Sequence, residues 1–180
     1  MIDISMPPAE HGMSPNGSWN AIWWGSRSCV AAFGHSVRDE QGLKGMMRYN
    51  PDFNPQGLRS PTPRPDFVVI HQGAIRSILD TKYRDLWDRQ RRLPREMLYQ
   101  LVIYAISLRQ HPQSSILYPT TDCLAKEARI DVADPLFGKH LGQVCLRPVL
   151  LPLLEKMLSL GTAQARRERD AYARWLAFGE

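Results

Sequence analysis

The clearest folding signal in the chain is the segment PDFVVIHQGAIRSILDTKY, which occupies residues 65–83. It contains two runs rich in apolar and β-branched residues, Phe67–Ile70 and Ile75–Tyr83, on either side of Gly73. Two such runs around a glycine predict a β-hairpin. Five prolines between residues 51 and 65 precede the hairpin and predict a loop without regular structure.

Two acidic residues occupy matching positions in this hairpin. Asp66 opens the first run and Asp80 lies near the end of the second, symmetrically about Gly73. A hairpin that turns at Gly73 sets them nearly opposite each other on one face, with Cβ atoms about 4.5–5.5 Å apart. Lys82 lies two residues beyond Asp80 and therefore shares its face. A register slip of one residue would abolish this arrangement.

The three charged side chains suggest a metal site. Two neighbouring carboxylates repel each other unless a cation lies between them, and a hard divalent ion such as magnesium suits oxygen ligands. The flanking strand residues are apolar, so the hairpin should be largely buried, where an unpaired charge is unfavourable. The alternative is that Asp66 starts the strand at a solvated edge and that Asp80 and Lys82 are ordinary surface residues.

The remaining pattern predicts an α/β fold with a mixed central sheet flanked by helices. We divide the chain into a leader and poorly patterned N-terminal segment, residues 1–60, and a core with C-terminal helices, residues 61–180. Strands are expected at Ser115–Tyr118 and Gly142–Val149, and helices at Trp19–Phe33, Arg95–Gln110, Leu151–Leu160 and Thr162–Phe178.

Composition narrows the class of protein. The 180 residues suffice for one domain, and the net charge of +5 favours an anionic partner such as nucleic acid. The three cysteines lack CxxC spacing, which argues against a disulfide framework or a structural zinc site. No apolar run is long enough for a spanning helix or a signal-peptide core, so we expect a cytoplasmic protein without membrane contact.

Four short motifs together resemble the C-terminal nuclease domain of McrC, the nuclease subunit of the McrBC modification-dependent restriction system. They are PD at residues 65–66, ILDTKY at 78–83, YQLVIYA at 99–105 and LYP at 117–119. That domain belongs to the PD-(D/E)xK superfamily, whose RecB-like branch carries a similar Gln-xxx-Tyr helix. The resemblance covers residues 64–120 and implies a PD-(D/E)xK restriction-endonuclease-like core.

The resemblance also implies roles for individual residues. Asp66 and Asp80 would ligate magnesium, or manganese as an alternative, together with the backbone carbonyl of Thr81. Lys82 would orient or activate the attacking water, and Gln100 and Tyr104 would line the site and touch the substrate. Such nucleases often carry another acid before the first motif, for which Glu40 or Asp39 is the candidate in this chain.

The basic and histidine residues outside the motifs can also be explained without a role in function. Arg84 opens an arginine-rich stretch reaching Arg95 that could flank bound DNA, or could be a solvated loop. We expect the arginines of the last helix to form a solvated face. We expect His71, beside the hairpin turn, to be exposed.

The leading hypothesis is a metal-dependent endonuclease that hydrolyses phosphodiester bonds of foreign DNA. Its partners would be DNA and an NTPase motor or specificity subunit, although McrC-like proteins usually have a longer N-terminal part that engages a GTPase. The first alternative is a non-catalytic nucleic-acid-binding or assembly subunit that retains the nuclease fold. The second is a small basic α/β domain whose motifs are accidental.

Overall fold

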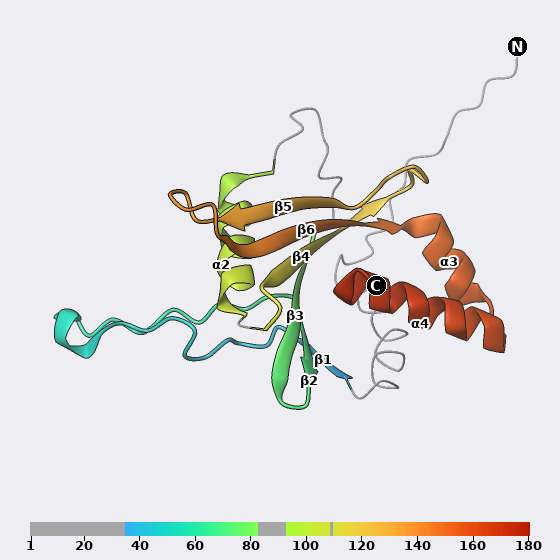
Figure 1. Cartoon of the computed structure of the whole chain (residues 1–180). Coiled ribbons are helices and arrows are strands. Elements are labelled where there is room, and N and C mark those ends of the chain that lie inside the picture. The colour runs from blue at the N-terminus through green and yellow to red at the C-terminus, as the bar shows by residue number, and fades with distance from the viewer. Residues whose placement is uncertain (1–34, 83–92, 109) are drawn as a thin grey trace, which may run out of the picture.

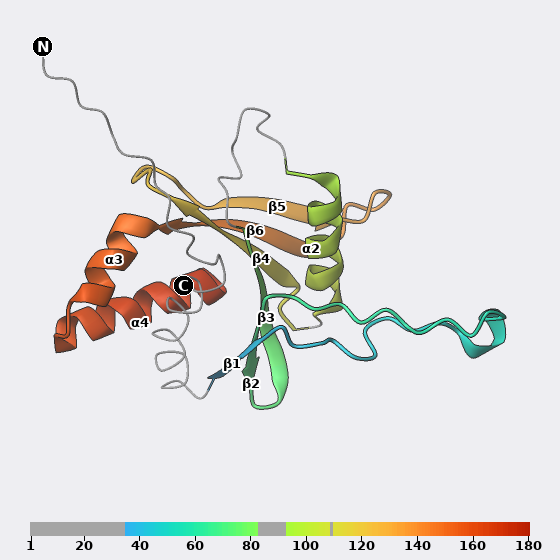
Figure 2. The ribbon, with the colours of Figure 1, turned by 180° about the vertical axis from the view of Figure 1, so that it is seen from behind.

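The computed structural model describes residues 35–82, 93–108 and 110–180. A six-stranded sheet forms the centre of the described part (Figure 1). Helix α2 packs on one face against β3, β4 and β6, whereas α4 packs on the opposite face against β3. Figure 2 shows the same arrangement from behind, with α2 and the pair α3–α4 well separated. The predicted helix at Trp19–Phe33 and the position of Arg84 fall outside the described residues.

The sheet is mixed, as the sequence predicted. Its strand order is β1-β2-β3-β4-β6-β5. The β1–β2, β2–β3 and β5–β6 pairs are antiparallel, and the β3–β4 and β4–β6 pairs are parallel. The strands are β1 (His35–Asp39), β2 (Phe67–His71), β3 (Ala74–Thr81), β4 (Gln113–Thr120), β5 (Ala128–Ala133) and β6 (His140–Leu150).

The α-helices in the described residues lie close to their predicted positions. They are α2 (Arg95–Ser107), α3 (Leu151–Ser159) and α4 (Ala163–Phe178), and a short 3-10 turn that was not predicted, η1 (Pro51–Phe53), precedes them. Helix α2 ends three residues before the predicted Gln110, because Leu108 is already extended and Pro112 disfavours helical backbone just before it. The proline-rich loop is irregular apart from η1 and projects away from the sheet (Figure 1).

Two edge strands were not predicted. Strand β5 alternates half-buried and exposed residues, and β1 is mostly exposed, so neither forms a run of buried apolar residues. Strand β1 lies within the segment that the sequence indicated as poorly patterned, yet it pairs along its whole length with β2. By contrast, the interior strands β3, β4 and β6 contain long buried stretches because helices cover both of their faces.

The two faces of the sheet carry separate apolar cores. Alternate residues of β2 and β3 point in opposite directions: Val68 and Ile78 pack beneath α2, whereas Val69 and Leu79 pack beneath α4. Asp66 and Asp80 follow the alternation of Val68 and Ile78. Both acids therefore belong to the face that α2 covers.

Candidate functional site

The hairpin turn sets the register of the site. Gln72 and Gly73 form its tip with φ angles of 50° and 78°, which is the backbone of a two-residue type I′ turn. A regular ladder from this turn, beginning with His71 opposite Ala74, would bring Asp66 opposite Leu79 rather than Asp80. The acids would then lie on different faces of the sheet.

A β-bulge corrects that register. The pairing shifts between Val69 and Ile70, which leaves Arg76 as the extra residue on β3. Beyond the bulge Phe67 pairs with Leu79, and continuing this register by one residue sets Asp66 opposite Asp80. The register thus directs the two acids to the same face, as predicted, but it results from a turn at Gln72–Gly73 combined with a bulge, not from symmetry about Gly73.

Asp66 is half-buried, and Thr81 holds its carboxylate in place. Both the backbone N–H and the hydroxyl of Thr81 donate hydrogen bonds to Oδ2 of Asp66, each at 2.6 Å. Two donors on one oxygen fix the rotation of the carboxylate. The hydroxyl contact was not predicted, because Thr81 was considered only for its backbone carbonyl. That carbonyl's role as a metal ligand stays a prediction.

Asp80 is the more deeply buried acid, with 5% of its surface exposed. Its Oδ2 forms an ion pair with Nζ of Lys82, whose side chain is 29% exposed. Burial raises the pKa of Asp80, and the charge of Asp66 raises it further, against the opposing effect of Lys82. Apart from this ion pair, Oδ2 accepts no hydrogen bond from the residues that the structure describes. Asp80 is thus an ionisable group whose negative charge is incompletely compensated.

Helix α2 contributes two polar side chains to the same face. Nε2 of Gln100 donates a hydrogen bond to the hydroxyl of Tyr104 at 2.9 Å, and Tyr104 is 1% exposed. Burial raises the pKa of Tyr104; the hydrogen bond from Gln100 opposes this effect, and the nearby charges of Asp80 and Asp66 add to it. The helix therefore brings its Gln-xxx-Tyr pair next to the two acids.

A third acidic ligand is not assembled in the described part of the chain. No group of three histidine, cysteine, aspartate or glutamate side chains there is close enough to hold a metal ion. Glu40 is exposed, and its backbone N–H donates to the carbonyl of Asp66 at 2.9 Å. Glu40 is thus adjacent to Asp66 through the backbone only, and its role as a ligand stays a prediction.

The residues present nevertheless fit a divalent cation of the magnesium type. Magnesium is commonly bound in proteins by one or two carboxylates and completes its shell with water and substrate phosphate. Asp66 and Asp80 supply such a pair, and the buried Oδ2 of Asp80 needs a positive partner beyond the half-buried Lys82. No helix among the described residues is long and apolar enough to cross a membrane.

Fold and site together define an α/β protein with a carboxylate–lysine cluster at one end of a mixed sheet. Residues 50–119 match the family described as "McrBC 5-methylcytosine restriction system component". The similarity to the McrBC family that the four motifs indicated is therefore confirmed over this segment, which contains Asp66, Asp80, Lys82 and the Gln-xxx-Tyr pair of α2.

Comparisons over the whole chain add two findings. No curated protein matches it. Among solved structures, it is similar to a chain in the "Refined half-complex from tetradecameric assembly of Thermococcus gammatolerans McrB AAA+ hexamers with bound McrC", with a TM-score of 0.40 and 18% sequence identity. The alignment covers 77% of this chain and 28% of that chain, so this protein spans less than a third of the other's length.

Proposed function

We propose that this protein is a metal-dependent DNA endonuclease that acts in a restriction system, with a PD-(D/E)xK core and with Asp66, Asp80 and Lys82 as its catalytic centre. The observation that carries the proposal is the juxtaposition of these three side chains on the face of the sheet that α2 covers. The family match over residues 50–119 supports the restriction role.

The geometry suggests different roles for the two acids. Asp66 is held by Thr81, so its carboxylate is oriented before any ligand arrives. Asp80 is buried and paired with Lys82. Both carboxylates would hold magnesium, or manganese in its place. When bound, such a cation would supply Lewis acidity at the scissile phosphate.

Lys82 is the residue proposed to act on the substrate directly. Its side chain is partly exposed while its ammonium group is anchored by Asp80, so it can reach a phosphate from a defined position. The ammonium would orient the attacking water and stabilise the negative charge that develops on the phosphate oxygens. Gln100 is exposed and would line the site and contact the DNA backbone, whereas Tyr104, which is 1% exposed, would act by holding the Gln100 side chain through their hydrogen bond.

The test is cleavage of supercoiled and linear plasmid, with and without 5-methylcytosine, in magnesium, manganese or EDTA. Asp80→Ala and Lys82→Ala should each abolish metal-dependent cutting. Matched controls are Asp52→Ala and Lys156→Ala, which remove exposed charges from η1 and α3. Cutting that survives in both site variants would refute the assignment of the catalytic centre.

A non-catalytic nucleic-acid-binding or assembly subunit is the second candidate. It is favoured by the lack of a third acidic ligand near Asp66 and Asp80 in the described part of the chain. Calorimetry with magnesium and manganese separates the two proposals when no cutting is seen. Metal binding that requires Asp80 points to an enzyme that needs a further subunit, for example an NTPase motor, whereas no metal binding favours the non-catalytic protein.

A further inference from the structure

A second polar site lies on the other face of the sheet, at the opposite end of β3. It is a pocket of about 440 Å³ whose described lining includes three histidines and two arginines. Ser77, in its wall, donates a hydrogen bond to the carbonyl of Ala177 at 2.7 Å, so the pocket lies where the end of α4 meets β3. Asp80 lies three residues further along β3 and faces α2. The pocket is therefore separate from the carboxylate site.

The charge of the pocket favours an anion. Arg76 from the β3 bulge and Arg174 from α4 both line it, and Glu180 is the acidic residue among its described lining. Nη1 of Arg76 donates to Oε1 of Gln110 at 2.7 Å, a neutral acceptor that orients the guanidinium without cancelling its charge. A guanidinium oriented in this way matches the paired oxygens of a phosphate group.

The rings in the pocket favour a flat partner. The ring centroids of His35 and His71 are 4.3 Å apart, and those of His35 and Phe178 are 5.2 Å apart. His71 is half-buried in this cluster and not exposed as the sequence suggested. These rings are tilted with respect to one another, by 31° and 49°, and their faces provide a surface on which a nucleobase can lie, since every base has a π-face. Among the arginines of α4, which were expected to form a solvated face, Arg174 is exposed and also lines this pocket.

We infer that this pocket binds a nucleotide, with its phosphate at Arg76 and Arg174 and its base against the ring cluster of His35, His71 and Phe178. A volume of about 440 Å³ lies within the range of small-molecule sites, which is about 300–1,000 Å³. The nucleotide can be free or can be the phosphorylated end of a DNA strand, because both present the same phosphate and base. The inference does not depend on the proposed nuclease activity.

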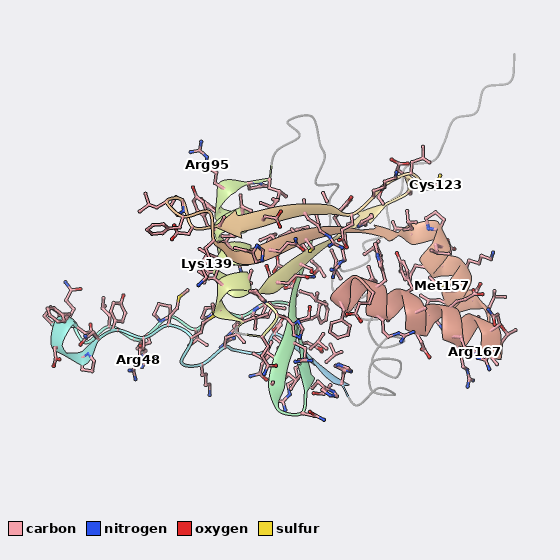
Figure 3. All side chains as sticks on the ribbon, viewed as in Figure 1. Arg48, Arg95, Cys123, Lys139, Met157 and Arg167 are labelled. Carbon is pink, nitrogen blue, oxygen red and sulfur yellow. The ribbon has the colours of Figure 1, made fainter. Side chains whose placement is uncertain are left out.

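Calorimetric titration of the full chain in EDTA tests this binding without any contribution from cleavage. The probes are a deoxynucleoside monophosphate, and a short single strand with or without a 5′-phosphate. Arg76→Gln and Arg174→Gln should each weaken binding about tenfold or more, the effect of losing one charge-assisted contact. Arg167→Gln is the matched control, because it removes the same charge from the other end of α4 (Figure 3).

The outcomes separate clearly. Saturable binding of the monophosphate that both pocket variants weaken, and the control does not, supports a site for free nucleotides. Binding confined to the 5′-phosphorylated strand supports a site for DNA ends. The inference is overturned if the folded wild type binds none of the probes, or if Arg167→Gln weakens binding as much as the pocket variants do.

Discussion

Replacing Asp80 with asparagine should make the metal-free protein more stable at neutral pH while removing the proposed nuclease activity. Asp80 is 5% exposed, and burial is the largest influence on its pKa, which is raised from 3.8. Asparagine has nearly the same shape but carries no charge. The substitution therefore removes an unfavourable buried charge and, at the same time, the ion pair with Lys82.

The size of the effect follows from these two opposing contributions. The ion pair contributes about 0.2–1 kcal/mol, because the Lys82 side chain is 29% exposed and solvent screens the pair. Desolvation of the nearly buried carboxylate is larger, since burying an ion is unfavourable by several kcal/mol. We expect a net gain of about 1–2 kcal/mol, which raises the melting temperature of a chain this long by about 2–8 °C.

The difference in stability between Asp80→Asn and the wild type should depend on pH. A carboxyl group whose pKa is raised by folding contributes stability below its unfolded value, and that contribution is lost as the pH rises through the folded value. The Asp80→Asn protein and the wild type should therefore be close in stability near pH 3.8 and diverge above it, with the variant the more stable. Comparing the two proteins at each pH cancels the titration of groups that do not interact with Asp80.

Urea denaturation between pH 4 and 8, with and without magnesium, measures both effects. Magnesium should stabilise the wild type by about 2.7 kcal/mol at one hundred times its Kd, and should have little effect on Asp80→Asn. Asp52→Asn, at an exposed site, is the control for loss of one negative charge. A variant less stable than the wild type at pH 7 without metal, or a difference that does not change with pH, would refute this account of Asp80.

Two further predictions concern a buried residue that stabilises the fold and a residue that positions Asp66. Arg147→Met should lower the free energy of unfolding by about 3–5 kcal/mol in urea denaturation, because Arg147 is fully buried and pairs with Glu127. Arg129→Met removes an exposed partner of the same acid and should lower it by about 1 kcal/mol or less. An equal loss in both variants would contradict the importance of burial. Thr81→Val should lower the affinity for magnesium, measured by calorimetry, about 10–100-fold, because it removes one hydrogen bond to Asp66. Thr81→Ser, which keeps the hydroxyl, should restore the affinity. Unchanged affinity in Thr81→Val would exclude a positioning role for Thr81.

The sequence predicted the elements whose periodicity reflects burial. The hairpin, α2, β4, β6 and the two C-terminal helices each contain apolar residues at the spacing of their core-facing side. The edge strand β5 escaped detection because half of its residues face solvent and it carries charges such as Arg129 and Asp131. The apolar periodicity of the sequence therefore predicted the elements that cover and form the buried part of the sheet, but not the edge strands β1 and β5.

Contacts between distant polar residues could not be predicted from spacing. Arg147 is fully buried on the α4 side, where it donates to Oε2 of Glu127, to Oγ of Ser115 and to the carbonyl of Leu176. Nothing in the local sequence distinguishes this arginine from a surface residue. Burial also raises the pKa of Glu127, but hydrogen bonds and charge from Arg147 and Arg129 outweigh it and lower the pKa overall.

The β-bulge at Arg76 has a consequence for how this hairpin can change in length. The ladder is counted from the pair His71–Ala74, so residues added to the Gln72–Gly73 tip would leave the register, and the positions of the two acids, unchanged. A residue added to or removed from either strand between that pair and the acids would turn one carboxylate to the other face, unless a bulge absorbed the change. The loop is therefore free to vary in length, whereas the lengths of the two strands are tied to each other.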